Sequence, residues 1–562
     1  MTRNAKKQTL PLGGRGKHAT KTRFMAVLAA TSSALAMAQW HSAHALNLYS
    51  AGNLEINLDT TVEYSAFYRV NDPSKILLDS PRALNYNDGD QNFQHGIVAN
   101  ELSVLPVLDV KDGNYGMHVS GQVYLNTPYL GTNQNGSPYT NNALSIAKNN
   151  DFTSATRNVN GENAQLLDAF AYGSFNFGAN NGQELTVKVG RQTLIWGQSL
   201  FFANNGIAAG QAPINILTAE SVPNAQAQQI FMPVGQAVVT YQPNQILTFQ
   251  AYYQFEWRQD FFQGSGAYFS NIDFFDKGGQ RLFFAAPNPF FPGVYVTRTR
   301  DLTPSNANGQ FGAAAMASLG NYDLGLYALR FDSKSPEVYT DVTSNGVGNI
   351  GKYWLVYPRD IQMFGASLST TVGPVNVAGE ISGRKNMPLV QNPFPPPGVA
   401  NTAYPGSGNA GALYPVGSTV AAQVSGIYIT PPLPLDPGGM TIIGEFAMNH
   451  VVSVDSGRND LEPGRSPSAG AFEIVATPAY YDVLPNLELQ FPIGLTYNLF
   501  GRSQVDLNMN HGTGSVSFGV TATYRTTWIA GLTYNTYLGR PDPILNPLAD
   551  RGYLSFNIQH TF

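Results

Sequence analysis

Residues 54–70 read LEINLDTTVEYSAFYRV, and apolar and polar side chains alternate along this stretch. The odd-numbered positions, from Glu55 to Arg69, are polar except for Phe67. Successive side chains of a strand point to opposite faces, so the pattern predicts a β-strand with one apolar face. Strands of water-soluble proteins usually have about five or six residues. A strand this long is typical of a tilted strand that crosses an outer membrane and extends beyond it.

The same alternation recurs along the chain and predicts eighteen strands, joined by connections that are alternately short and long. Short turns on one side and long loops on the other are typical of outer-membrane barrels. We therefore predict an all-β fold, a transmembrane antiparallel outer-membrane β-barrel of about 18 strands, with 16 or 20 as alternatives. Short periplasmic turns and long external loops that partly fill the lumen are expected. The long loops are predicted at 71–96, 128–164, 194–232, 259–309, 333–357 and 385–417.

The chain ends in an alternating strand, Tyr553 to Phe562, whose last residue is aromatic. This ending resembles the signal by which outer-membrane barrels are recognised for insertion, so Phe556, Ile558 and Phe562 are predicted to form a terminal assembly signal. The barrel-assembly machinery is then an expected partner. His560 departs from the pattern, because an aromatic or aliphatic residue is usual there. Closure of a barrel requires this strand to pair with residues 54–70.

The N-terminus has the layout of a secretory signal peptide. Seven basic residues precede an apolar stretch from Phe24 to about Ala38, and Ala43-His44-Ala45 matches a cleavage site. We expect residues 1–45 to be removed and residues 46–562 to form a single barrel domain. The mature chain would carry 25 basic and 37 acidic residues, a formal net charge of −12. Such a charge argues against a nucleic-acid partner.

The composition favours a barrel embedded in lipid. Aromatic residues and charged residues each make up 12% of the chain, whereas soluble domains have roughly 25% charged residues. No cysteine is present, which excludes disulfides and thiolate metal sites, and no cofactor is expected. The expected location is the outer membrane of a Gram-negative bacterium, in contact with lipid and lipopolysaccharide. A secreted β-sandwich or β-helix is the alternative.

The stretch LTVKVGRQTLIWGQS at residues 185–199 is more specific than the alternation. It resembles the signature of an uncharacterised proteobacterial family, the "domain of unknown function" numbered thirteen hundred and two. Residues 167–170, 249–257 and 379–388 also resemble this family, and the resemblance covers most of residues 46–562. The family-like motif comprises Gly190, Arg191, Gln192, Trp196 and Gly197.

The resemblance implies a porin-like outer-membrane barrel. Family members often occur beside genes for hydrophobic-compound catabolism and for large efflux-type transporters, which implies passage or handling of apolar molecules. The chain departs from the family pattern after Ser199, because residues 206–233 form a longer loop rich in Ala and Gln. The resemblance therefore implies no role for this loop.

The predicted loop 259–309 is unusually aromatic for an external segment. Large apolar patches exposed to water usually mark binding or inward folding. We expect the loop to fold over or into the barrel, either as a path for an apolar solute or as a structural plug. The candidate path residues are Phe261, Phe262, Phe269, Phe274, Phe275, Phe283, Phe284, Phe290 and Phe291.

The polar faces of the predicted strands are acidic. Such a lumen would favour cations or neutral solutes if it is open, and otherwise it is a solvated, salt-bridged interior. Arg191 is expected to pair with a carboxylate or to contact lipopolysaccharide phosphates, and Trp196 to lie in the interfacial girdle. The predicted acidic lumen face comprises Glu55, Asp59, Glu63, Asp168, Glu256, Glu380, Glu445 and Glu488.

Together these patterns predict a non-enzymatic channel or transport component for small hydrophobic solutes. The main alternative is an outer-membrane hydrolase with an active site at the rim, and a structural or adhesive barrel is a third possibility. The mature chain has only five histidines and no Gly-x-Ser-x-Gly motif. The histidines are His95, His118, His450, His511 and His560.

Overall fold

The computed structural model describes residues 46–562, except 138–140, 147, 179–181, 276, 307–308, 393–413, 433 and 435–437. The predicted signal peptide lies outside the described residues. So does most of the proline-rich part of the 385–417 loop.

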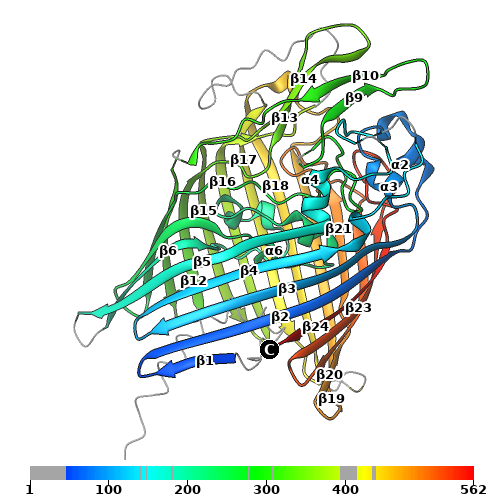
Figure 1. Cartoon of the computed structure of the whole chain (residues 1–562). Coiled ribbons are helices and arrows are strands. Elements are labelled where there is room, and N and C mark those ends of the chain that lie inside the picture. Colours follow the sequence, from blue (N-terminus) through cyan, green and yellow to red (C-terminus); the bar gives the residue numbers. More distant parts are fainter. Residues whose placement is uncertain are drawn as a thin grey trace, which may run out of the picture. The chain divides into compact units, whose positions relative to one another are not determined.

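Eighteen antiparallel strands close into a barrel (Figure 1). Each strand pairs with its neighbours in the sequence, and β24 (Tyr553–Thr561) pairs with β2 (Leu54–Arg69) in a register that sets Thr61 opposite Thr561. The predicted strand number and the predicted closing contact are confirmed. The other wall strands are β3 (Gly96–Asp112), β4 (Tyr115–Asn126), β5 (Glu162–Phe177), β6 (Gln183–Gln192), β7 (Val234–Gln242), β8 (Leu247–Gln254), β11 (Gln310–Leu319), β12 (Tyr322–Phe331), β15 (Ile361–Val372), β16 (Val375–Pro388), β17 (Val416–Ile429), β18 (Met440–Ser456), β19 (Ser468–Leu484), β20 (Leu487–Gln490), β21 (Ile493–Phe500), β22 (Gly514–Tyr524) and β23 (Trp528–Leu538).

Strands β20 and β21 count as one wall strand. Proline has no N–H to donate to a β-ladder, and Pro492 lies at the break between the two strands. Both halves keep one register against β22, where Glu488 is opposite Thr523 and Ile493 is opposite Phe518. The wall is therefore continuous across the break.

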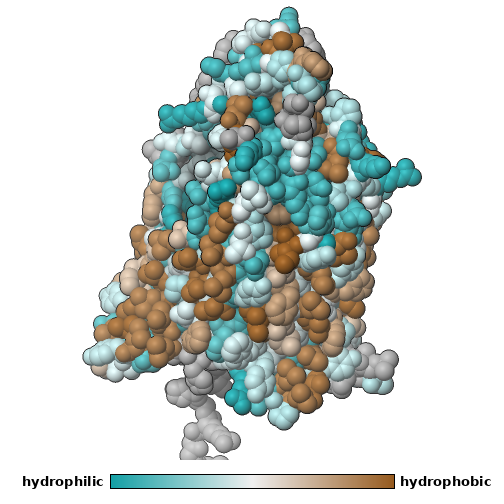
Figure 2. All heavy atoms as spheres, turned by 45° about the vertical axis from the view of Figure 1, so that its right-hand side comes forward, coloured by the Kyte–Doolittle hydropathy of each residue, from teal (hydrophilic) through white to brown (hydrophobic). Residues whose placement is uncertain are grey.

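The outer face of the wall is apolar and the inner face is mostly polar. Phe249 and Tyr253 on β8 are about half exposed, while Tyr252 and Gln254, on either side of Tyr253, are buried. Exposed apolar side chains cover the strands in Figure 2. A closed sheet pairs all of its backbone groups and can face lipid in this way. No helix in the described part of the chain is long and apolar enough to cross a membrane.

Phe67 is the exception in the predicted strand because it faces a filled part of the lumen. Its ring stacks on Tyr553 at 5.4 Å and meets Phe269 edge to face at 6.3 Å. Loop residues from 259–309 thus reach the inner face of β2. His560 lies parallel to the ring of Trp528 at 4.2 Å and beside Phe562 at 4.5 Å. It therefore packs as an aromatic residue would at that position.

Two long loops contribute an external sheet that the periodicity did not predict. Its order is β13-β14-β10-β9, from β9 (Arg281–Ala285), β10 (Val294–Arg298), β13 (Glu337–Val342) and β14 (Gly348–Val356). Figure 1 shows this sheet beyond one mouth of the barrel. An additional strand, β1 (Leu46–Ala51), pairs with the start of β2 and was also missed.

The helices are short and lie in the long loops. They are α2 (Lys75–Asp79), α3 (Asp88–Asn92), α4 (Ser154–Thr156), α5 (Ile216–Ser221) and α6 (Ala227–Ile230), with single turns η1 (Pro81–Ala83), η2 (Thr127–Tyr129), η3 (Arg157–Gly161), η5 (Ala203–Asn205), η6 (Ile207–Gly210) and η8 (Arg458–Asp460).

Candidate functional site

Residues 193–233, which join β6 to β7, fold into the barrel, and we call them the inner loop. The loop leaves and rejoins the wall at one place, because Gln192 and Val234 are directly paired. Between these points it bonds to side chains on β16, β18, β22 and β24. The inner loop therefore crosses the lumen and obstructs it.

Two carboxylates on the wall hold the first half of the inner loop. Glu445 accepts hydrogen bonds from the backbone N–H groups of Leu200, Phe201 and Phe202 at 3.1, 2.6 and 3.0 Å. Glu380 accepts from the backbone N–H groups of Gln198 and Ile207. Backbone donors that lie in a loop inside a protein must find acceptors. Glu380 and Glu445 supply these acceptors, which explains why the two carboxylates are buried.

Arg384 holds the same segment through its carbonyl groups. Its Nη2 donates to the carbonyl oxygens of Asn205 and Gly206 at 2.7 and 3.0 Å, and its Nη1 donates to that of Asn204 at 3.2 Å. Glu380 and Arg384 lie four residues apart on β16, on the same lumen-facing side of the strand. Strand β16 thus supplies an acceptor for the backbone N–H groups of the loop and a donor for its carbonyl oxygens.

Gly197 lies where the loop approaches Glu380 most closely. Its φ of +90° lies in the left-handed region, and a Cβ there would lie 2.0 Å from Glu380 Oε2. Glycine alone adopts this conformation without a side-chain clash. The preceding Trp196 is 3% exposed and packs against Tyr252 and Tyr327.

The second half of the inner loop is held by fewer contacts among the described residues. Tyr553 Oη donates to the carbonyl oxygen of Ser221 at 2.9 Å, and Asn224 Nδ2 donates to Ser517 Oγ at 2.8 Å. Most side chains from 216 to 226 are half-exposed. Ile214 and Ile216 also donate to Asp260 and Phe261 in the next loop, so this half is the less strongly held part of the obstruction.

A cavity of about 510 Å³ lies between the inner loop, the barrel wall and the external sheet. The inner loop contributes Ile214 and Glu220, the wall contributes Ile361 and Arg384, and the external sheet contributes Val338. Ligand pockets typically have volumes of about 300–1,000 Å³ and combine apolar walls with a few polar groups. The cavity fits this description and is our candidate functional site.

Three charged groups of the cavity have strongly shifted pKa values. Burial lowers the pKa of Lys334 to about 8, and its Nζ donates to the carbonyl oxygens of Gly210 and Asp332 and to Gln310 Oε1. Burial raises the pKa values of Glu220 and Glu337 to about 8. Burial thus favours the neutral form of both acids, so the cavity is less acidic than its composition suggests.

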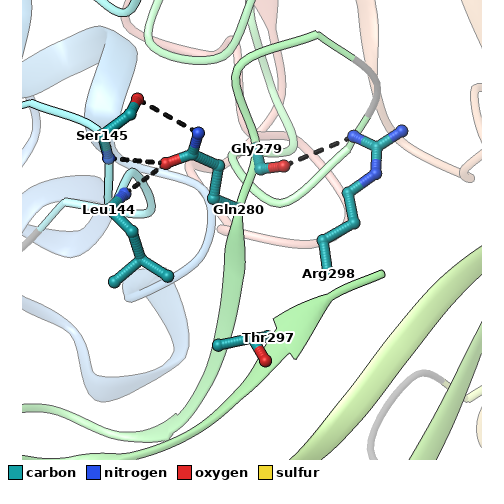
Figure 3. Close-up of a pocket in the computed structure, with 6 residues that line it drawn as sticks. All are labelled: Leu144, Ser145, Gly279, Gln280, Thr297 and Arg298. Carbon is teal, nitrogen blue, oxygen red and sulfur yellow. Dashed lines mark hydrogen bonds between the residues drawn. The ribbon is translucent and has the colours of Figure 1, made fainter. Parts of the chain in front are cut away.

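A second hollow of about 450 Å³ lies on the external face and is shown in Figure 3. Gln280 Oε1 accepts from the backbone N–H groups of Leu144 and Ser145, and its Nε2 donates to Ser145 Oγ. The side-chain amide is thus already satisfied within the protein. This hollow offers little to a ligand.

The family model described as "Protein of unknown function (DUF1302)" matches residues 23–562. The chain belongs to the DUF1302 family. No curated protein matches it.

Solved porin structures resemble this DUF1302 barrel at low identity. OccAB1 of Acinetobacter baumannii is 12% identical, with a TM-score of 0.43 over 92% of this chain and 99% of its own. A BenF-like porin from Pseudomonas fluorescens Pf-5 is 11% identical, with a TM-score of 0.41 over 91% and 98%. OpdK of Pseudomonas aeruginosa, solved with vanillate, is 10% identical, with a TM-score of 0.41 over 90% and 98%. These similarities are too weak to transfer a function.

The residues of the family-like motif lie at the base of the inner loop. Arg191 pairs with Glu256, with 2.5 Å between Nη2 and Oε1, so the expected pairing with a carboxylate is confirmed. The interfacial position expected for Trp196 is wrong, because the indole lies inside the barrel. Gly190 has a φ of +134°, and Gln192 is buried beside the carbonyl oxygen of Gln236. The motif of this DUF1302 protein therefore anchors the inner loop.

The phenylalanines of 259–309 have different surroundings. Phe262, Phe274 and Phe275 line the cavity. Phe269 and Phe283 are buried, whereas Phe290 is 98% exposed at the tip of the β9–β10 hairpin. Phe261, Phe284 and Phe291 are half-buried. The structure thus brings only three of the nine candidate path residues to the cavity.

The eight residues of the predicted acidic lumen face also have different surroundings in the structure. Glu380 and Glu445 bind the inner loop, and Glu256 binds Arg191. Glu55 is exposed, and Asp59, Glu63, Asp168 and Glu488 are half-buried on wall strands. The residues missed from the sequence are Lys334, Arg384 and Arg465, which line the cavity. Alternation marks Arg384 as lumen-facing, but nothing in the local sequence marks the two loop cations.

Replacing Glu445 by Gln should loosen the turn at residues 200–202. Both carboxylate oxygens accept from backbone N–H groups, and an amide would place an NH2 donor against one of these donors. Hydrogen bonds to charged groups contribute roughly 1.5–3 kcal/mol. We expect backbone amide exchange at 198–207, measured by mass spectrometry, to accelerate about tenfold or more. Glu55→Gln, at the exposed end of the same face, is the control and should change nothing.

Proposed function

We propose that this DUF1302 barrel is an outer-membrane channel through which small, predominantly hydrophobic solutes diffuse passively. The observation that carries the proposal is the cavity of about 510 Å³ inside a closed wall, with Phe262, Phe274 and Phe275 on its surface. An apolar solute would leave water for this cavity and would pass the lightly held second half of the inner loop. No covalent step and no cofactor takes part.

The proposal includes export by a signal peptide at residues 1–45 and location in the outer membrane of a Gram-negative bacterium. Lipid and lipopolysaccharide would surround the apolar outer face. The terminal residues Phe556, Ile558 and Phe562 would serve as the signal to the barrel-assembly machinery. Pairing of β24 with β2 supports this, because closure of the barrel depends on the last strand.

A locked inner loop tests the proposal. The chain has no cysteine, so Asn224→Cys with Ser517→Cys would introduce two thiols, where Asn224 Nδ2 lies 2.8 Å from Ser517 Oγ, and a short bis-methanethiosulfonate reagent would join them through reducible disulfides. We expect cells that express the unmodified protein to take up N-phenylnaphthylamine faster than cells without it. The locked variant should lose most of this gain, and a reductant should restore it. Equal uptake with and without a folded surface barrel would reject the channel.

One observation bears on the rival hydrolase. His450 Nδ1 lies 2.7 Å from Ser468 Oγ, across neighbouring strands and exposed. Among the described residues no hydrogen bond is recorded at Nε2 of His450, so the third member of a triad is missing. Ester hydrolysis by the purified barrel that is lost in Ser468→Ala would establish the rival class. The described residues contain no group of three His, Asp or Glu side chains placed to hold a metal.

A further inference from the structure

Two arginines that line the cavity carry buried N–H groups without an acceptor. Arg384 is 3% exposed and its Nε has no partner among the described residues, although both of its terminal nitrogens donate to the inner loop. The side chain of Arg465 is 1% exposed, and its Nη2 likewise has no partner in the described part of the chain. A buried donor left unpaired costs about 1–3 kcal/mol, and more when it is charged. These two donors mark a place where an acceptor is missing.

Both guanidinium groups line the same cavity, as does Asp506. Burial raises the pKa of Asp506, and the positive charges of Arg465 and Arg384 both act to lower it. Both arginines therefore lie near the same carboxyl group, in the 501–513 loop. Asp506 forms no ion pair with either of them among the described residues, and its Oδ1 accepts from the backbone N–H of Asn508. The nearby carboxyl group thus leaves both donors unsatisfied.

The remaining contacts of the arginines leave them positioned for a ligand. Arg465 Nε pairs with Glu462, and its Nη1 donates to the carbonyl oxygen of Ser503 at 2.6 Å. These contacts fix the plane of the guanidinium group. Guanidinium groups stay charged, and their hydrogen bonds to an ionised oxygen such as that of a carboxylate are about twice as strong as bonds between neutral groups. The missing acceptor is therefore best supplied by a carboxylate.

The same cavity also has an apolar, aromatic surface. Phe262 and Phe275 form an edge-to-face pair with ring centroids 5.0 Å apart, and both line the cavity with Ile272. Aromatic pairs in this arrangement accept a further ring at favourable geometry. Gln391 Oε1 and Asn510 Oδ1, also at the cavity, have no donor among the residues that the structure describes. A hydroxyl group on the ligand would satisfy one of them.

We infer that the cavity binds a small aromatic carboxylate, with its carboxylate between Arg384 and Arg465 and its ring against Phe262 and Phe275. This inference rests on the proposed function, since it names the class of solute that the channel carries. The carboxylate supplies the acceptor that the two arginine N–H groups lack, and the ring leaves water for the aromatic pair. The cavity would thus select solutes that have a carboxylate at one end and an aromatic ring at the other.

Titration of the purified mature barrel with 6-hydroxy-2-naphthoate, followed by the fluorescence of the ligand, tests the inference. We expect saturable binding, and at least tenfold weaker binding of 6-hydroxy-2-naphthamide, which has the same ring without the charge. Arg465→Gln should weaken carboxylate binding about tenfold or more, because a charged hydrogen bond is lost. Arg465→Lys should bind less well than the wild type, because it keeps the charge without the planar donors.

Arg458→Gln is the matched control, because this exposed arginine lies outside the cavity lining. It should bind the naphthoate as the wild type does. Equal affinity for the acid and the amide, or unchanged binding in a folded Arg465→Gln barrel, would overturn the inference. Absence of binding to the wild type would also overturn it.

The uptake experiment separates this inference from the channel itself. Binding without any solute uptake would support the carboxylate site and reject the channel. Uptake of N-phenylnaphthylamine without naphthoate binding would support the channel and reject the site.

Discussion

Replacing residues 195–231 by a short Gly-Ser turn should raise the single-channel conductance of the barrel several-fold. Gln192 and Val234 are directly paired, and neighbouring strands lie only about 4.8 Å apart. A turn of a few residues therefore reconnects β6 and β7 without strain. Removal of the inner loop clears the lumen, while the wall keeps its strand-to-strand hydrogen bonds. Planar-bilayer recordings of the refolded variant measure the effect.

A deletion outside the lumen is the control for this variant. Ala285 and Val294 are paired across the β9–β10 hairpin, so its tip at 286–293 can be shortened in the same way. This change should leave the conductance as it is. A folded barrel without residues 195–231 that conducts like the wild type would show that the inner loop is not the main obstruction.

Replacing Arg551 by Ala should detach the loops that cap the barrel near β24. Arg551 is 0% exposed, and it forms an ion pair with Asp90 and donates to the carbonyl oxygens of Tyr268 and Ser270. It thus ties three loops, 70–95, 255–309 and 539–552, to one another. Arg69 on β2 binds the same Asp90 at 2.9 Å.

Removal of one member of a buried ion pair typically costs about 3–5 kcal/mol. In Arg551→Ala we expect rapid proteolysis at 255–309 at protease concentrations that leave the wild type intact. Arg82→Ala removes an exposed ion pair to Asp542 and should cost less than about 1 kcal/mol. Equal protease resistance of both variants would show that the buried network does not hold the cap.

The wall could be predicted because its signals are local. Alternation on each strand reports which side faces lipid, and turn residues report where the chain reverses. Trp257 shows the limit of this signal, because the alternation continues to residue 257 while β8 ends at Gln254. Beyond that point, Phe255 and Glu256 both donate to Gly235 at the start of β7, and Trp257 bonds to Asn306 and Ser333 in the loops.

The contents of the lumen could not be predicted in the same way. Glu380 and Glu445 were identified as acidic lumen residues, but their partners are backbone N–H groups about 170–250 positions away in the chain. The sequence predicts an interfacial position for Trp196, because tryptophan is common at membrane interfaces. Its burial depends on Tyr252 and Tyr327, which only the closed barrel brings together. The four strands of the external sheet also pair across two different loops.

The sequence by itself determined the closed barrel, its strand number to within one hairpin, the pairing of the terminal strand ending at Phe562, and the lipid-facing side of the strands that alternate clearly. These follow from a two-residue period and from chain reversals, which need no long-range information. Only the tertiary structure decided what fills the barrel. The inner loop lies where it does because buried backbone groups must find partners, and those partners lie on strands distant in the chain. The cavity and its two unpaired arginine donors are consequences of that packing.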